Sequence, residues 1–123
     1  MVEYSLVVDA RYQRTGDLDK AETHYRSVLS QHPNRADVHF NLGNVLREQG
    51  DFQGAMIHYR QALAIQPDLA NARYMFGVVL EERQRTQEAI ACYRKAIALV
   101  PDLTEAHVAL GRLLEQQDWH KKL

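Results

Sequence analysis

Three residues that could bind a metal ion recur at one fixed interval in this sequence. His24, His58 and Cys92 stand 34 residues apart, and imidazole and thiolate groups are ligands that zinc prefers. Zinc ligands must converge within roughly 2.0–2.3 Å of a single ion. If the interval reflects a structural repeat, equivalent side chains are separated by a pair of packed helices, a distance beyond ~10 Å. The spacing therefore argues against a metal site, and we expect none.

Motifs that carry enzymatic chemistry are absent from the sequence. There is no glycine-rich phosphate-binding loop, no Gly-x-Ser-x-Gly nucleophile motif and no Cys-x-x-Cys pair. Acidic residues are plentiful, but we expect them on exposed helix faces, where nothing shifts the pKa of a carboxyl group toward neutral pH. We therefore expect neither catalysis nor a cofactor.

The composition is that of an ordinary globular domain. Apolar residues make up 46% and charged residues 25% of the 123 residues, which excludes a disordered chain. The formal net charge of −1 gives no electrostatic reason to expect binding to nucleic acid or to an anionic membrane. The single cysteine suits a reducing compartment, and no apolar run approaches the length of a membrane span. We expect a cytoplasmic protein in which one domain covers residues 1–123.

The elements that hold these residues repeat with the same period of 34 residues. The period appears in five sets of residues in one register: Pro33, Pro67 and Pro101; Gly43, Gly77 and Gly111; Ala21, Ala55 and Ala89; Tyr25, Tyr59 and Tyr93; and Tyr12, Leu46, Leu80 and Leu114. Five coincident sets indicate a structural repeat rather than chance similarity. The repeats cover residues 2–35, 36–69 and 70–103, and residues 104–123 begin a fourth.

Each repeat divides into two helical patterns. Its first half carries apolar residues at helical spacing, as in Val38, Leu42 and Val45. Gly50 and Asp51 interrupt this pattern, since glycine ends helices and aspartate caps the next one. Proline stops the second helix, and we expect Asn34, Asp68 or Asp102 to help start the helix that follows. No segment alternates like a strand, so the predicted fold is all-α.

Glycine in the middle of a predicted helix indicates close helix packing. Gly43, Gly77 and Gly111 occupy such positions, where glycine costs about 1 kcal/mol relative to alanine. We expect Ala55 or Ala89 of the second helix to approach the glycine. Tyr59 and Tyr93 are then expected to pack between adjacent hairpins.

In these features the sequence resembles the tetratricopeptide repeat family. The residues at the family's set offsets are His39, Leu42, Gly43, Leu46, Ala55, Tyr59 and Pro67 in the second repeat, and Arg73, Phe76, Gly77, Leu80, Ala89, Tyr93 and Pro101 in the third. Four features depart from the pattern: Asp9 replaces a glycine, Val28 stands where later repeats have alanine, Gln84 and Arg85 replace Gly-Asp at a turn, and the fourth repeat lacks its second helix. The resemblance implies a right-handed superhelical solenoid of antiparallel hairpins, with three repeats and a terminal helix.

The resemblance also implies a concave groove that is lined by the first helix of each repeat and binds peptides. Carried over by repeat position, together with neighbouring charged residues, the groove comprises Leu6, Asp37, Phe40, Asn41, Asn44, Arg47, Asn71, Tyr74, Met75, Val78, Glu81, Glu105, Val108 and Arg112. Helical geometry supports this set, because Phe40 and Asn44 share a face distinct from that of Val38, Leu42 and Val45. Acidic residues outnumber Arg47 and Arg112 around the track, which favours a ligand with apolar anchors and basic flanks.

Two specialised subclasses of the family fit less well. The subclass that binds C-terminal carboxylates uses paired lysine, asparagine and arginine, and here Phe40, Asn71 and Met75 stand where cations are needed. The superhelices of protein O-glycosyltransferases carry asparagine at the sixth position of each repeat, and only Asn41 does so here.

Three functions remain open from the sequence. The first is a protein–protein interaction scaffold that binds a peptide or helix of apolar and basic character. The second is the recognition segment of a larger enzyme such as an O-glycosyltransferase. The third is a self-assembly unit, since the last predicted helix has apolar residues and no partner helix, so that a homo-oligomer through the terminal helices is possible.

Overall fold

The computed structural model describes residues 17–122, with the side chains of residues 120–122 excepted. This part of the chain contains α2 (Leu18–Gln31), α3 (Ala36–Glu48), α4 (Phe52–Ile65), α5 (Ala70–Glu82), α6 (Thr86–Leu99) and α7 (Thr104–Lys122). No strand occurs among these residues, which confirms the all-α prediction. None of the described helices is long and apolar enough to cross a lipid bilayer. Leu6 and Asp9 lie outside the described residues.

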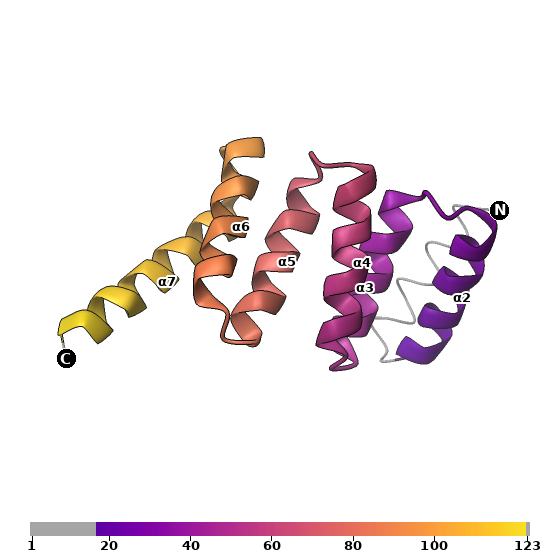
Figure 1. Cartoon of the computed structure of the whole chain (residues 1–123), viewed down its shortest axis with the longest axis horizontal. Helices are drawn as coiled ribbons and strands as arrows, with labels where there is room; N and C mark the ends of the chain where they lie inside the picture. Colours follow the sequence, from indigo (N-terminus) through magenta and orange to yellow (C-terminus); the bar gives the residue numbers. More distant parts are fainter. Residues whose placement is uncertain (1–16, 123) are drawn as a thin grey trace. The chain divides into compact units, whose positions relative to one another are not determined.

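The helices belong to two compact units, Met1–Gln66 and Pro67–Leu123. In the first unit α3 packs against both α2 and α4, and in the second α6 packs against both α5 and α7. Figure 1 shows α5 and α6 running in opposite directions side by side, joined by a short turn. The helices α3, α5 and α7 are the first helices of their repeats, and α2, α4 and α6 are second helices. The predicted helical hairpins are thus confirmed.

The turns inside the hairpins use a left-handed residue to end the first helix. Gly50 has φ +85° and Gln84 has φ +62°, a region that glycine enters without steric cost. Asp51 N–H then donates to Leu46 O over 2.8 Å, and Arg85 N–H donates to Leu80 O over 2.8 Å. These bonds satisfy carbonyl groups at the end of the helix. The expected aspartate cap is also confirmed, because Asp51 Oδ1 accepts from Gly54 N–H over 2.9 Å.

The starts of the first helices differ from the expectation. Arg35 and Leu69 are the N-cap residues of α3 and α5, and neither makes a side-chain cap bond. Asn34 and Asp68 therefore do not cap these helices. Instead, a side chain one turn into each first helix donates to the carbonyl of the proline before it. The bonds are His39 Nε2 to Pro33 O (2.9 Å), Arg73 Nη2 to Pro67 O (3.3 Å) and His107 Nε2 to Pro101 O (2.7 Å).

A tyrosine ring lies directly against the mid-helix glycine in both complete hairpins. A Cβ added to Gly43 would lie 2.6 Å from Tyr59 Cε1, and one added to Gly77 would lie 2.6 Å from Tyr93 Cε1. Both tyrosines are fully buried. The predicted close approach is confirmed, but its partner was wrong: the tyrosine ring, not Ala55 or Ala89, contacts the glycine. An alanine methyl group is too short to fill the space that the aromatic ring occupies.

A pair of imidazoles connects α3 to α4 in the first unit. The His39 and His58 Nδ1 atoms are 3.1 Å apart, and the ring centroids are 5.3 Å apart. The Pro33 carbonyl can only accept, so His39 Nε2 carries a proton and, in the neutral ring, His39 Nδ1 accepts from His58 Nδ1. Burial, together with the nearby His39 and Arg26, lowers the pKa of His58 to about 4, against the opposing effect of Asp51 and Glu22. No cluster of three or more metal-ligating side chains occurs among the described residues.

Alanine substitution should change stability differently at Gly43 and Gly77, which contact tyrosine rings, and at Gly111. Among residues 17–122, nothing beyond its two chain neighbours and the backbone of its own helix lies within 4 Å of a Cβ added to Gly111. For Gly43→Ala or Gly77→Ala, crowding of a buried ring costs about 1–3 kcal/mol, against a gain in helix propensity of about 1 kcal/mol. We expect a net loss of unfolding free energy in urea denaturation. Gly111→Ala gains helix propensity without crowding and should raise stability by up to about 1 kcal/mol. Equal effects at all three positions would contradict the tyrosine–glycine contact.

The histidine pair should make stability fall in mild acid. His58 takes up a proton near pH 6.5 when unfolded but only near pH 4 when folded, so between these values the unfolded chain binds more protons. The contribution of His58 is therefore complete above about pH 6.5 and is lost as the pH falls toward 4. Urea denaturation at several pH values between 7.5 and 4.5 measures the slope. His58→Gln should flatten this slope relative to the parent, and an unchanged slope in His58→Gln refutes the assignment.

Candidate functional site

The predicted groove residues of the first unit lie on one face of α3. Asp37 is exposed, while Phe40, Asn41, Asn44 and Arg47 are half-buried. The opposite face holds Val38, Leu42 and Val45, at most 2% exposed. This division confirms the two faces that the helical spacing indicated. The structure thus leaves the predicted α3 residues accessible beside a packed core.

A contact between two aromatic rings supports the face of α3 that carries the predicted groove residues. The Phe40 and Tyr59 ring centroids are 6.0 Å apart with planes inclined by 43°, an arrangement that aromatic pairs favour. The Tyr59 hydroxyl donates to Asn44 Oδ1 over 2.5 Å. The core tyrosine therefore fixes both the ring of Phe40 and the orientation of the Asn44 amide, whose two N–H donors this bond does not use.

The second unit repeats this arrangement with different polar groups. The Tyr74 and Tyr93 ring centroids are 5.7 Å apart with planes inclined by 37°. The Tyr93 hydroxyl donates to Glu81 Oε1 over 2.8 Å. Tyr74 is half-buried, like Phe40 one repeat earlier. Each described hairpin therefore presents one aromatic side chain that rests on a fully buried tyrosine.

Glu81 connects the core of the second unit to α7. Its Oε2 accepts from Arg112 Nη1 over 2.5 Å, and its Oε1 accepts from Arg112 Nη2 over 3.0 Å. The Arg112 guanidinium holds the pKa of Glu81 below its usual range, and the Tyr93 hydroxyl acts in the same direction against burial. Burial and the hydrogen bond to Glu81 raise the pKa of Tyr93. All three groups keep fixed charge states near neutral pH, which suits recognition of a ligand.

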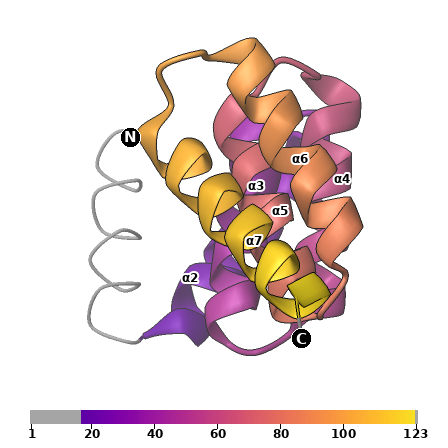
Figure 2. The same ribbon diagram turned by 90° about the vertical axis from the view of Figure 1, so that its left-hand side faces the viewer.

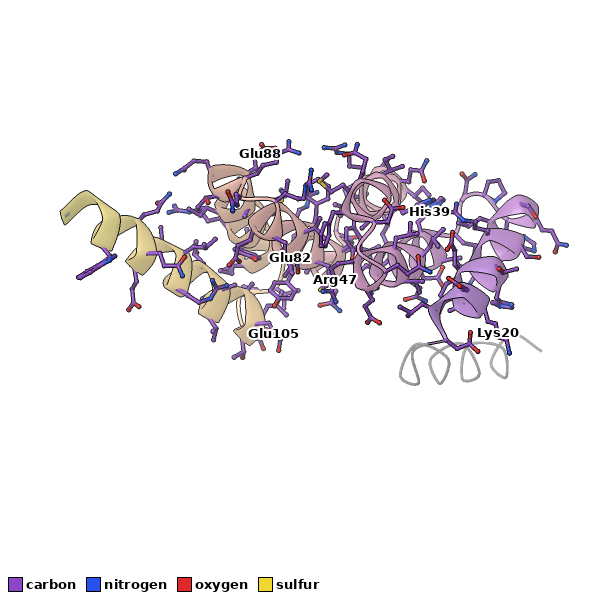
Figure 3. All side chains as sticks on the ribbon, turned by 90° about the horizontal axis from the view of Figure 1, so that it is seen from below. Lys20, His39, Arg47, Glu82, Glu88 and Glu105 are labelled. Atoms are coloured by element: carbon purple, nitrogen blue, oxygen red, sulfur yellow. The ribbon has the colours of Figure 1, made fainter. Side chains whose placement is uncertain are left out.

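Around this ion pair lies a cleft with a volume of about 310 Å³. Its lining consists of Tyr74, Val78, Glu81, Glu82, Tyr93, Ala109 and Arg112. Four predicted site residues, Tyr74, Val78, Glu81 and Arg112, are thus brought together. Asn71, Met75, Glu105 and Val108 are not part of the lining. Figure 3 labels Glu82 on α5 and Glu105 near the start of α7.

The site differs from the sequence prediction in its charge. Asp37 forms an ion pair with Arg35 over 2.7 Å, which lowers the pKa of Asp37, and Glu81 is neutralised by Arg112. Arg35 was not counted among the groove cations, since it precedes α3 rather than lying on it. Arg35 therefore adds one positive charge beside the track that the sequence analysis did not count, whereas Arg112 was already included.

Two apolar residues extend the site along α7. Val108 is 63% exposed and Trp119 is 62% exposed. They lie about three helical turns apart and so share one face of the helix. The spacing between Val108 and Trp119 in the sequence could have assigned Trp119 to the same helix face as Val108.

Two protein-family models match the sequence of this chain. A model described as tetratricopeptide repeat matches residues 11–70, and one described as TPR repeat matches residues 77–118. No curated protein matches the sequence.

Solved structures of similar fold include the first TPR of Spaghetti (RPAP3) bound to the HSP90 peptide SRMEEVD, with a TM-score of 0.85, 20% identity, and coverage of 89% of this chain and 87% of that one. The Arabidopsis OM64 TPR domain has a TM-score of 0.84, 25% identity, and coverage of 88% and 89%. A mutant O-GlcNAc transferase from Thermobaculum terrenum has a TM-score of 0.84 and 28% identity, with coverage of 92% of this chain but only 22% of that one.

The repeated tyrosine–glycine packing and the two family-model matches lead to one conclusion: this chain belongs to the tetratricopeptide repeat family.

Proposed function

We propose that the chain binds a partner protein through the groove faces of α3, α5 and α7, which contact an extended peptide or a helix. The observation that carries this proposal is the repeated aromatic platform, Phe40 on Tyr59 and Tyr74 on Tyr93. A half-exposed ring that is fixed by a buried one loses little conformational freedom when a ligand packs on it. Preorganised aromatic side chains are therefore favourable anchor points in interfaces.

The second unit supports a ligand with basic as well as apolar groups. Glu82 and Tyr74 both line its cleft, as does the ion pair of Glu81 with Arg112. A lysine or arginine side chain that enters this cleft would meet a carboxylate and the electron-rich face of an aromatic ring. Val78 offers an apolar contact to the neighbouring side chain of the ligand.

The same geometry disfavours a ligand recognised by its C-terminal carboxylate. Arg112 is the cation of the described cleft, and Glu81 already occupies both of its terminal nitrogens. A free carboxylate would have to displace this bidentate pair, which is a strong charge-assisted interaction. The likeness to a domain bound to an HSP90 peptide accordingly extends to the fold alone.

A second candidate is that the chain is the recognition segment of a larger enzyme. The likeness to an O-GlcNAc transferase favours this candidate, because the chain aligns with 22% of that protein. In such an enzyme the groove would position a polypeptide substrate for chemistry performed elsewhere. The coding sequence on either side of this segment distinguishes the two candidates, since only the second requires a transferase domain.

Peptide selection followed by mutagenesis tests the groove. A random heptapeptide library is selected on the purified chain, and a selected peptide is titrated by calorimetry. We expect aliphatic or aromatic residues together with lysine or arginine, and equal affinity when the peptide C-terminus is amidated. Phe40→Ala and Tyr74→Ala should each raise Kd about tenfold, since loss of an aromatic anchor costs about 1.4 kcal/mol or more.

Ile57→Ala is the matched control for these variants. Ile57 is 43% exposed on α4, the second helix of the same hairpin as Phe40, so its loss should leave Kd unchanged. The groove proposal fails if Ile57→Ala weakens binding as much as Phe40→Ala. A selected consensus that is acidic or requires a free carboxylate would overturn the proposed ligand chemistry.

A further inference from the structure

The helix α7 begins as the first helix of a repeat. His107 donates to the Pro101 carbonyl as His39 does to Pro33 and Arg73 does to Pro67. Ala106 and Leu113 of α7 are at most 3% exposed, like their counterparts Ala72 and Val79 of α5. By both its start and its buried face, α7 therefore occupies the place that α3 and α5 hold in their hairpins.

The face that α3 and α5 turn toward their second helices is uncovered on α7. The rings of Tyr59 and Tyr93 fill the space over Gly43 and Gly77. In the described part of the chain, by contrast, nothing beyond its two chain neighbours and the backbone of its own helix lies within 4 Å of a Cβ added to Gly111. Leu46 and Leu80 are 2% and 0% exposed, whereas Leu114, at the equivalent position, is only half-buried, as is Leu110. We name Leu110, Gly111 and Leu114 the open hairpin face.

The chain does not fold back onto this face within the described residues. The helices α3 and α5 end at Glu48 and Glu82, whereas α7 continues through the equivalent residue Gln116 to Lys122. Figures 1 and 3 both show the C-terminal half of α7 projecting past α5 and α6. Figure 2 views the molecule from this end, with α7 nearest the viewer. Within the described residues, the open hairpin face is therefore not covered by a second helix that follows α7 after a tight turn.

The two complete hairpins define what fits such a face. In α4 the residues buried against the hairpin include Ala55, Tyr59 and Ala62, and in α6 they include Ala89, Tyr93 and Ala96, all 0% exposed. Both sets have the spacing Ala-x-x-x-Tyr-x-x-Ala. These spacings place the three side chains on one side of a helix. The tyrosine ring enters the space left by glycine, and the alanines permit close approach of the helix axes.

We propose that the open hairpin face of α7 is a docking surface for a helix of a partner protein that carries alanine and tyrosine with this spacing. This surface is distinct from the groove, because its two leucines, Leu110 and Leu114, lie on a different side of α7 from Val108 and Trp119. The partner helix completes the fourth hairpin in trans. Its tyrosine packs on Gly111, and its alanines pack against Leu110 and Leu114.

A second copy of this chain is a poorer occupant than a separate partner. The tyrosines of the described second helices, Tyr25, Tyr59 and Tyr93, are at most 3% exposed. A second copy could present one of them only by opening its own hairpin, which would expose a core aromatic side chain to water. A helix whose tyrosine is not already buried avoids this cost.

The probe for this proposal is a synthetic helix with the sequence of Thr86–Leu99. It is cross-linked between the exposed positions Gln87 and Ala91 to hold it helical and carries Cys92→Ser to prevent oxidation. Binding to the isotopically labelled full chain is measured by anisotropy and mapped by NMR. We expect the backbone amide signals of Leu110, Gly111 and Leu114 to shift. Tyr93→Ala in the peptide should weaken binding at least tenfold.

Gly111→Ala in the full chain is the decisive variant. Among the described residues, its added methyl group meets nothing beyond its two chain neighbours and the backbone of its own helix, so the fold is retained. The methyl group would crowd the incoming tyrosine ring and should weaken binding at least tenfold. The groove peptide should bind Gly111→Ala with unchanged Kd, which separates this proposal from the groove. The proposal is overturned if the probe fails to bind, shifts the signals of α5 instead, or binds Gly111→Ala as tightly as the parent. Concentration-dependent dimerisation in sedimentation, abolished by Gly111→Ala, would also overturn it by assigning the face to a second copy.

Discussion

The packing of a tyrosine ring against a glycine in the middle of a helix is the contact on which the rest of this structure depends. A helix gives up stability wherever it carries glycine in its interior, yet Gly43 and Gly77 occur at the same place in successive repeats. The compensation is the buried ring of Tyr59 or Tyr93, which fits only where no side chain stands. The contact fixes the rotation and the depth at which the two helices of a hairpin meet. It thereby determines which residues of the first helix are buried and which remain on the surface.

The same tyrosines connect the hydrophobic core to the proposed binding surface. Each ring supports an aromatic neighbour on its outer side, and each hydroxyl finds an acceptor on the first helix, Asn44 in one hairpin and Glu81 in the other. The two acceptors come from different repeat positions, so identical packing accommodates different surface chemistry. The repeats are therefore equivalent in their cores and individual in their polar groups, which allows one scaffold to recognise different ligands.

The sequence predicted the helices, their order and the buried face of α3, because these depend on local periodicity that each repeat displays again. It could not predict which side chain meets Gly43, since alanine and tyrosine both recur in the register of the second helix and only three-dimensional packing distinguishes them. The ion pair of Glu81 with Arg112 was missed for a similar reason: its members are 31 positions apart and lie on helices that are not consecutive. The groove as a whole, and a cytoplasmic location, remain predictions. Within the second unit, the structure gathers Tyr74, Val78, Glu81 and Arg112 around one cleft.

The principal interhelical contacts also have a consequence for how the chain acquires its structure. They join α2 to α3, α3 to α4, α5 to α6 and α6 to α7, always neighbours along the sequence. Such low contact order is typical of helical proteins that fold in microseconds to milliseconds, because only short loops must close before packing begins. During synthesis, α3 and α4 can dock as soon as both have left the ribosome, before the residues of α6 have been translated. A gene that gained or lost one 34-residue segment would leave the remaining hairpins with their partners intact.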